Sequence, residues 1–300
     1  LIDTPSLVVD LDAMERNIQR MADFARQHAV RWRPHAKMHK SAEIALLLQR
    51  AGATGACVQK VTEAEALAAG GVNDIYISNE VVAPSKLLRV ARLAAHLAAC
   101  GGHLAIAVDS AEGIERLAEA MAAAGSADGI DVFVEIDVGQ GRCGVPPGAP
   151  AVTLALAVAR HARLRFAGLQ AYHGRAQHLP GAADRREAIA AAVRATEHTR
   201  ALIVAAGLPM PLVTGSGTGT LVHEAASGVY GELQAGSFLF MDADYARNER
   251  EPAQPAFEQA LFVKTQVISV SDSHAVCDAG HKSHAIDSGL PVVALLPPDR

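Results

Sequence analysis

One lysine of this 300-residue chain stands in a strongly basic segment. Lys37 lies within the run Arg33–Ser41 (R-P-H-A-K-M-H-K-S), which also contains two histidines and a second lysine, Lys40. Neighbouring positive charge lowers the pKa of a lysine, and a neutral amine is the form that condenses with an aldehyde. The segment therefore indicates covalent carbonyl chemistry at Lys37, with an exposed basic loop as the alternative interpretation.

A second candidate is the glycine-rich run Thr214–Gly219 (T-G-S-G-T-G), followed further along the chain by Gly236 and Ser237. Glycines let backbone N–H groups approach phosphate oxygens, and serine and threonine hydroxyls add further donors. The two segments therefore predict a phosphate-binding site. An ordinary glycine-rich turn is the simpler alternative.

These residues need a scaffold that brings them together. Short β-rich runs alternate with longer Ala/Leu-rich stretches, which is typical of βαβ units and a parallel sheet. After a first strand at Ser6–Asp10 and a helix from about Asp12, eight strands are predicted at Val30–Pro34, Gly55–Val58, Asp74–Ser78, Leu104–Asp109, Asp131–Ile136, Arg165–Ala171, Pro211–Thr214 and Glu232–Ala235. Helices are predicted at Ala42–Ala51, Glu63–Ala69, Pro84–Ala99, Ala111–Ala124, Ala151–Ala162 and Ala183–Ala206. This alternation predicts an α/β fold with a (β/α)8 barrel of the TIM type.

Polar residues follow nearly every predicted strand, at the ends where such barrels carry their catalytic groups. They include Lys37, Gln59, Arg142 and Tyr172 after the first, second, fifth and sixth barrel strands. The two glycine-containing segments follow the seventh and eighth strands, where barrels often bind phosphate. One shared site is therefore expected, although loops are commonly polar for other reasons.

The alternation changes after Phe257, where strands are predicted without helices between them. These strands are Ala260–Val270, His274–Asp278 and Pro291–Leu296. Residues 12–246 are therefore predicted to form the barrel, and residues 1–11 with 256–300 a β-rich domain. The last predicted strand has no closing element after it, so the natural chain is expected to continue beyond Arg300.

Composition restricts the class of protein. Half of the residues are hydrophobic and the formal net charge is −5, with no long basic run, so a nucleic-acid surface is not expected. The four cysteines form no C-x-x-C pair, which argues against a structural zinc site or a disulfide framework. The cysteine pattern therefore leads us to expect a reducing, cytoplasmic location. No apolar run approaches the roughly 18 residues of a membrane span.

Motifs along nearly the whole chain resemble those of D-threonine aldolases. These enzymes belong with D-serine dehydratases to the fold-type III, alanine-racemase-like enzymes that use pyridoxal 5′-phosphate (PLP). The run Arg33–Ser41 resembles the PLP-lysine motif of the family. Further resemblances lie at Thr4–Asp12, Gln59–Glu65, Ile77–Val82, Val134–Val145, Gly168–Gly174, Thr214–Gly219 and Gly228–Tyr245. The stretch Val134–Val145 (V-E-I-D-V-G-Q-G-R-C-G-V) is more similar to the aldolases than to the dehydratases.

The resemblance implies roles for individual residues. Lys37 would carry PLP as a Schiff base, Arg142 would contact the phenolic oxygen of PLP, and Tyr172 would lie near the imine. His178 fits the catalytic histidine of the family. The cofactor would further be held by Gln59, by Gln234 facing the pyridine nitrogen, and at its phosphate by Thr218, Gly219, Gly236 and Ser237.

The activity implied is retro-aldol cleavage of D-β-hydroxy-α-amino acids of the D-threonine type to glycine and an aldehyde. D-Threonine aldolases also need a divalent cation, Mn²⁺ or Mg²⁺, held by a His-x-Asp or His-x-Cys motif near the end of their chains. Residues 1–300 contain no match to that motif, so the metal rests on the resemblance and its ligands stay unassigned. His281 and His284 depart from the family pattern and are interpreted as a local variation rather than a metal site.

Other functions stay open. A 3-hydroxy-D-aspartate aldolase or a D-serine or 3-hydroxyaspartate dehydratase would share this fold, and Arg175 and Ile286–Pro291 are compatible with an acidic substrate. The substrate profile would separate them. A PLP-binding carrier protein without catalysis is more remote, because such proteins have a single domain. A racemase would need a second base that the sequence does not reveal. A homodimer is plausible from the wider fold.

Overall fold

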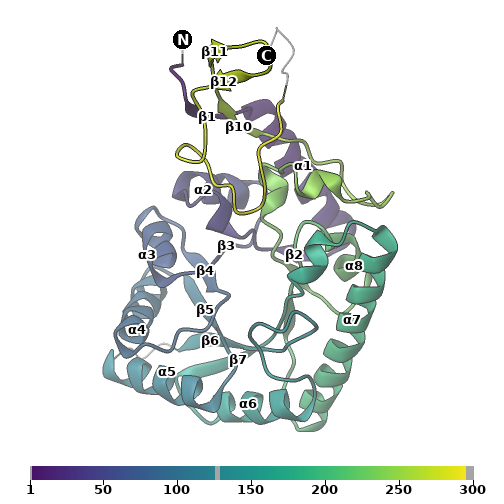
Figure 1. Ribbon diagram of the computed structural model, residues 1–300. Helices are drawn as coiled ribbons and strands as arrows, with labels where there is room; N and C mark the ends of the chain where they lie inside the picture. Colours follow the sequence, from purple (N-terminus) through teal and green to yellow (C-terminus); the bar gives the residue numbers. More distant parts are fainter. Residues whose placement is uncertain (1, 126–128, 295–300) are drawn as a thin grey trace.

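The predicted barrel strands form one parallel sheet. The computed structural model describes residues 2–125 and 129–294. The strands are β2 (Arg31–Trp32), β3 (Ala56–Val58), β4 (Asp74–Ile77), β5 (His103–Val108), β6 (Ile130–Glu135), β7 (Leu164–Ala171), β8 (Leu212–Gly215) and β9 (Glu232–Leu233). They lie in the order β2-β9-β8-β7-β6-β5-β4-β3, and a parallel bridge between His35 and Cys57 joins the two edges. The sheet thereby closes into the barrel that the sequence predicts (Figure 1).

Helices surround the barrel on its outside (Figure 1). They are α1 (Leu11–Gln27), α2 (Ala42–Arg50), α3 (Val61–Ala69), α4 (Pro84–Ala99), α5 (Ala111–Ala123), α6 (Ala149–Ala159), α7 (Ala182–Ala205) and α8 (Leu221–Ala226). The sequence analysis missed α8, because this helix has only six residues, too few to show a helical period. None of the helices in the described ranges combines the length and apolarity that crossing a membrane requires.

Successive side chains of each strand point alternately into the barrel and toward the helices outside it. In β4, Ile75 and Ile77 belong to the large cluster packed against the helices, whereas Tyr76 belongs to a small interior cluster with Cys57 and Phe133. The Tyr76 and Phe133 rings lie 4.9 Å apart between centroids. Successive side chains of a strand point to opposite faces, so this register follows from the sequence.

The strands outside the barrel form two small antiparallel pairs. Strand β1 (Ser6–Val9) pairs with β10 (Leu261–Lys264), and β11 (Val267–Val270) pairs with β12 (Ala275–Cys277). The single strand predicted at Ala260–Val270 is thus two strands. The prediction of a strand at Pro291–Leu296 is wrong for residues 291–294, which form none, and its last two residues lie outside the described ranges.

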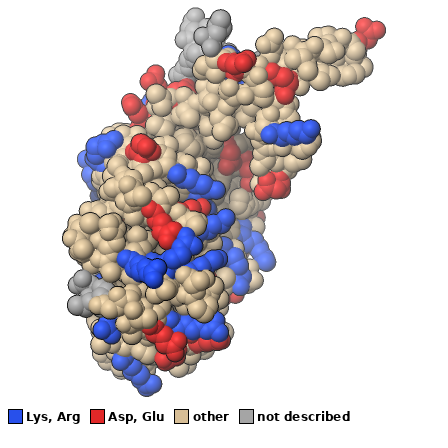
Figure 2. Space-filling model, turned by 90° about the vertical axis from the view of Figure 1, so that its left-hand side faces the viewer, with Lys and Arg blue, Asp and Glu red and all other residues tan. Residues whose placement is uncertain are grey.

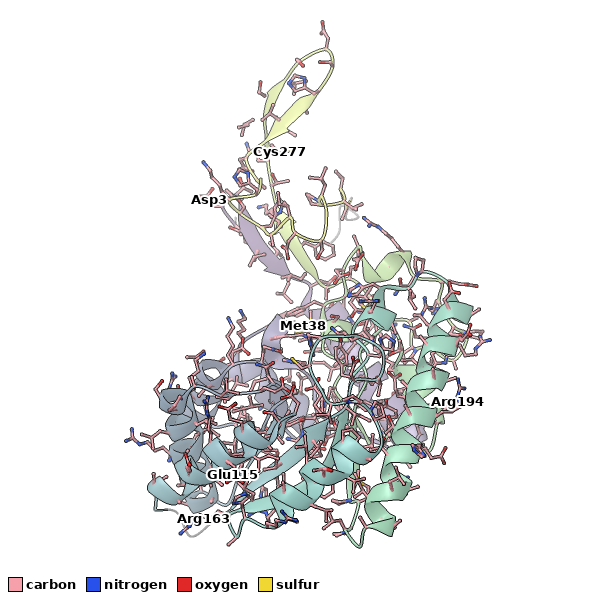
Figure 3. All side chains as sticks on the ribbon, turned by 60° about the horizontal axis from the view of Figure 1, so that its bottom comes forward. Asp3, Met38, Glu115, Arg163, Arg194 and Cys277 are labelled. Carbon is pink, nitrogen blue, oxygen red and sulfur yellow. The ribbon has the colours of Figure 1, made fainter. Side chains whose placement is uncertain are left out.

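The β11–β12 hairpin projects away from the rest of the chain (Figures 1 and 3). Its side chains are exposed, and Val270 retains 74% of its surface. In the space-filling view it forms a projection with little charge along its length (Figure 2). The division of the chain into two domains stays a prediction.

A buried arginine ties three barrel strands together. Arg33, which follows β2, donates from Nε to Oε1 of Glu232 (3.2 Å) and from Nη1 to Oδ1 of Asp74. The sequence analysis placed Arg33 in the basic cluster around Lys37. Its side chain instead is 8% exposed and paired with these two carboxylates. Pairing compensates the cost of burying the charge.

We expect Arg33→Met to lower the free energy of unfolding by about 3–5 kcal/mol, because it leaves two carboxylates without their buried partner. Arg31→Met is a matched control on the same strand, since Arg31 pairs with Glu232 (3.1 Å) but is 51% exposed. Loss of that pair is expected to cost about 1 kcal/mol or less. Urea unfolding measures both values, and equal losses would contradict this role of Arg33.

Candidate active site

A cavity of about 620 Å³ lies at the C-terminal ends of the barrel strands. Eight of the nine predicted cofactor-binding residues line it: Lys37, Gln59, Arg142, Tyr172, Thr218, Gln234, Gly236 and Ser237. Met38, which also lines it, lies at the end of the barrel that faces the β1–β10 pair, whereas Arg163 and Glu115 lie toward the opposite end (Figure 3). The structure therefore brings together residues that are far apart in the sequence.

Gly219 is the predicted residue that does not line this cavity. Its N–H donates to Oε1 of Gln177 (3.0 Å), so this donor is already used. Gln177 is fully buried and donates from Nε2 to Oγ1 of Thr220 (2.8 Å). Ser216 and Gly217 of the same loop line the cavity instead.

Lys37 reaches the cavity from the short 3₁₀ helix η1 (Ala36–Met38), directly after β2. The side chain of Lys37 is exposed to the cavity, but neighbouring protein atoms displace part of the water around its amine. This burial, and then the nearby charge of Arg142, lower the pKa of Lys37. A lower pKa favours the neutral amine, as the sequence analysis expects. The main cause is desolvation rather than the basic neighbours along the chain.

His35 places an unsatisfied donor on the same wall. Its Nδ1 accepts the backbone N–H of Lys37 (3.2 Å), so the neutral ring carries its proton on Nε2. Burial, and then the charge of Lys37, hold the pKa of His35 well below its ordinary value. Nε2 is buried and has no partner among the described residues. Such unpaired burial of a donor costs free energy.

The loops after β8 and β9 meet at one part of the cavity wall. The N–H of Phe238 donates to Oγ1 of Thr218 (2.9 Å), which joins the two loops. A Cβ at Gly236 would lie 2.7 Å from the carbonyl oxygen of His35, so a side chain there requires a backbone shift. Glycine backbone and the hydroxyl of Ser237 therefore form the wall. These groups suit an oxyanion such as a phosphate.

A single carboxylate shapes the loop that presents Arg142. Asp137 accepts the N–H groups of Gly139 and Gly141, each at 3.0 Å. The guanidinium carbon of Arg142 then lies 5.8 Å from the ring centre of Tyr172, within cation–π distance. The loop and the end of β7 thus hold a cation and a phenol side by side on the cavity wall.

The buried amide of Gln234 forms a neutral part of the wall. Its Nε2 donates to Oε1 of Gln170 (2.7 Å) and to Oγ1 of Thr214 (2.8 Å). Gln234 is 5% exposed and lines the cavity with this neutral amide. A cofactor ring nitrogen placed there would meet an uncharged amide, as the resemblance implies.

A second cavity of about 370 Å³ adjoins the first and shares Lys37, Arg142 and Tyr172 with it. His178 reaches this cavity from the 3₁₀ helix η2 (Arg175–His178), and its Nδ1 lies 2.7 Å from Oδ2 of Asp244. A carboxylate accepts but does not donate, so the proton of this hydrogen bond belongs to His178. In the neutral ring, Nε2 is then free to accept a proton.

Potential metal ligands meet near the Arg142 loop. Carboxylate oxygens of Glu80 and Asp109 and the sulfur of Cys143 lie within 4.8 Å of one another. In the part of the chain that the structure describes, this is the one group of His, Cys, Asp or Glu side chains with metal-like spacing, and His281 and His284 are outside it. Glu135 lies beside this group, and burial, and then neighbouring Glu80, raise the pKa of Glu135 to about 9, so that Glu135 carries a proton near neutral pH.

The sequence analysis missed several residues of the two cavities. Asp244 and Tyr245 stood at the end of a family-like motif, but nothing in the motif showed that Asp244 would contact His178. Gln170 lies in the predicted sixth barrel strand. It stands on the face of that strand that points into the barrel, and this position was the signal that could have identified it. Asp287 and Ser288 line the larger cavity from irregular chain, and the sequence analysis had named them only within Ile286–Pro291, as compatible with an acidic substrate.

Comparison with known proteins identifies the family. The family model described as alanine racemase, N-terminal domain, matches residues 9–244. A 3-hydroxy-D-aspartate aldolase of Paracoccus denitrificans (strain Pd 1222) is 44% identical over 298 residues, covering 97% of this chain and 76% of that protein. A D-threonine aldolase of Arthrobacter sp is 45% identical over 297 residues, covering 97% and 75%.

A solved structure agrees with these relatives. The crystal structure of D-threonine aldolase from Filomicrobium marinum superposes with a TM-score of 0.93 at 48% identity, covering 97% of this chain and 77% of that one. The chain therefore belongs to the alanine-racemase-like family of PLP-dependent enzymes, as a homologue of the D-threonine and 3-hydroxy-D-aspartate aldolases.

Proposed function

We propose that this protein is a lyase that cleaves D-β-hydroxy-α-amino acids of the D-threonine type to glycine and an aldehyde. The observation that carries the proposal is the pair of joined cavities. The larger cavity holds the amine of Lys37, whose pKa is lowered, beside the glycine and hydroxyl groups that suit an oxyanion. The smaller cavity is lined by His178, which pairs with Asp244. Similarity to named aldolases supports the same reaction.

The larger cavity fits PLP. Lys37 offers the amine to which the aldehyde carbon attaches, and His35 lines the same cavity with its Nε2 buried and unpaired. We assign Arg142 to the phenolic oxygen. The phosphate is assigned to Ser216, Gly217, Thr218, Gly236 and Ser237, and the remaining contacts to Gln59, Tyr172 and Gln234.

When bound, PLP supplies an electron sink for the bond that breaks. His178 accepts the proton of the β-hydroxyl at Nε2, and the electron pair of that O–H bond forms the C=O of the departing aldehyde. The pair of the Cα–Cβ bond stays with Cα, which then takes up a proton to complete glycine. Asp244 keeps the ring of His178 in the required tautomer and stabilises its positive charge after the transfer.

We also propose a divalent cation, Mn²⁺ or Mg²⁺, which would lower the pKa of the β-hydroxyl. Its ligands are not assigned, and the group of Glu80, Asp109 and Cys143 does not include His178. Chelation is expected to suppress cleavage and added Mn²⁺ to restore it, with the visible absorption of bound PLP unchanged. Full activity in chelator would remove the cation from the proposal.

The experiment that tests the function is product release from pure stereoisomers. Purified protein is incubated with D-threonine and with L-threonine, and glycine and acetaldehyde are measured together. We expect equal amounts of the two products from the D-isomer and none from the L-isomer. Oxaloacetate from 3-hydroxyaspartate or pyruvate from D-serine, without an aldehyde, would move the function to a dehydratase. Bound PLP with no turnover of any of these substrates would favour a carrier protein.

Asp244→Asn is expected to lower kcat for D-threonine by up to about 100-fold, less than the full contribution of a general base. The amide can donate to Nδ1 and so favours the wrong tautomer of His178. Tyr245→Phe is the comparison, since it keeps the ring that lies 5.4 Å from His178. A rate for Asp244→Asn equal to that of the unaltered enzyme would show that this carboxylate does not orient the base.

Assembly and location stay predictions of the sequence. We propose a homodimer in the cytoplasm, which analytical ultracentrifugation and cell fractionation would test. A small-molecule amino acid is the expected partner, with neither nucleic acid nor membrane bound.

A further inference from the structure

The smaller cavity is strongly cationic. Its lining consists of Lys37, Gln140, Arg142, Tyr172, Gly174, Arg175 and His178, without a single carboxylate. Two of these cations are already assigned, because Lys37 holds the cofactor and Arg142 faces its phenolic oxygen. Arg175 is the cation in this cavity without an assignment.

The short helix η2 places Arg175 and His178 on one face. Residues three apart eclipse one another in a 3₁₀ helix, and three residues rise about 6 Å along its axis. Exposure follows this geometry, since Arg175 and His178 are exposed while Ala176 and Gln177 between them are buried. Both exposed side chains line the cavity. The guanidinium therefore stands one turn from the proposed base.

The charge of Arg175 is not neutralised by the protein. No carboxylate of the described residues forms an ion pair with it, whereas His178 has Asp244. Nη2 of Arg175 donates to the carbonyl oxygen of Gln140 (3.3 Å), and the side-chain oxygen of Gln140 accepts the N–H of Gly174 (2.7 Å). This contact leaves other guanidinium donors for a ligand, and a guanidinium matches a carboxylate in two parallel hydrogen bonds.

We propose that Arg175 binds a carboxylate on Cβ of the substrate, so that the enzyme prefers 3-hydroxy-D-aspartate to D-threonine. The inference rests on the proposed function, in which His178 acts on the β-hydroxyl. A hydroxyl and a carboxylate on one carbon, each hydrogen-bonded, match two protein groups one 3₁₀ turn apart. The reaction is otherwise the same, with glyoxylate leaving in place of acetaldehyde.

The test compares two substrates in matched variants. Arg175→Gln is expected to lower kcat/KM for 3-hydroxy-D-aspartate by about 10- to 100-fold, mainly through KM, because a charge-assisted contact to bound substrate is lost. D-Threonine has a methyl group at that place, so its kcat/KM should change by less than about threefold. Arg175→Lys keeps the charge without the paired donors and should recover part of the loss.

Arg194→Gln is the control for net charge. Arg194 lies on the exposed side of α7, away from Met38 at the cavity (Figure 3), and its loss should leave the ratio of the two kcat/KM values unchanged. Equal losses for both substrates in Arg175→Gln would assign Arg175 to the α-carboxylate and overturn the proposal. Unchanged values for both would overturn it as well.

A binding measurement separates this inference from the proposed function. D-Aspartate and D-2-aminobutyrate lack the β-hydroxyl, and their binding to the PLP-loaded protein is followed by calorimetry. Tighter binding of D-aspartate that Arg175→Gln abolishes would support the carboxylate site, even if no substrate were cleaved and the aldolase function had failed. Equal binding of the two ligands by the unaltered protein would overturn the carboxylate site, even if D-threonine were cleaved.

Discussion

Replacement of Lys37 by alanine is expected to remove both the visible absorption of covalently bound PLP and all measurable cleavage of D-threonine. Lys37 presents an amine whose pKa is lowered by burial and by Arg142, so a larger neutral fraction is available at neutral pH. No other lysine lines either cavity. Absorption spectra of the purified protein after incubation with PLP measure the first effect.

Lys40→Ala is the matched control, because Lys40 belongs to the same basic segment but does not line the cavity. Its spectrum and rate should equal those of the unaltered enzyme. If Lys37→Ala kept the absorption and Lys40→Ala lost it, the cofactor would be attached to Lys40, and the geometry argued from η1 would be wrong.

His178→Ala should lower kcat for D-threonine by about 10²- to 10⁴-fold, the usual contribution of a general base, while the absorption of bound PLP persists. The two effects separate because His178 lines the smaller cavity and not the larger one. Stopped-flow rates and spectra on the same sample measure both.

The outcome of His178→Ala also distinguishes the base from a structural residue. His178→Gln retains a side chain that can reach Asp244 but cannot take up a proton near neutrality, so it should be as slow as alanine. Near-normal rates in either variant would place the base elsewhere. Loss of the PLP absorption would show that His178 supports the cofactor cavity instead.

The regular part of the fold was predictable because each element carries its own signal. Tyr76 between two isoleucines shows the period of a strand with two packed faces, and Ala/Leu-rich stretches of a dozen residues show helices. Helix α8 lacks that length, and residues 291–294 have the composition of a strand but no strand to pair with. Strand formation depends on a partner that the local sequence does not specify.

The residues of the site also fall into a part that was predictable from the sequence and a part that was not. Lys37, Arg142 and Tyr172 follow barrel strands, so the fold alone predicts that they converge. Asp244 lies outside the regular helices and strands of the barrel, where the path of the chain depends on tertiary contacts, and its contact with His178 was not predicted. Gly219 shows the limit of motif-based assignment, because its N–H turns toward Gln177 while its neighbours Gly217 and Thr218 line the cavity.

Gln177 connects the loop after β8, which is assigned to the cofactor, with the short helix η2, which is assigned to the substrate. Its side chain accepts a hydrogen bond from Gly219 in the loop after β8, and its carbonyl oxygen accepts one from Nδ2 of Asn248 (2.9 Å). Its neighbour His178 lines the smaller cavity, where the substrate side chain is proposed to bind. The groups assigned to PLP come from segments that follow several barrel strands, whereas those assigned to the substrate side chain stand on one short turn anchored by Gln177. Evolution or protein engineering can therefore vary Arg175 at the rim and change which aldehyde is released, without rebuilding the cofactor site.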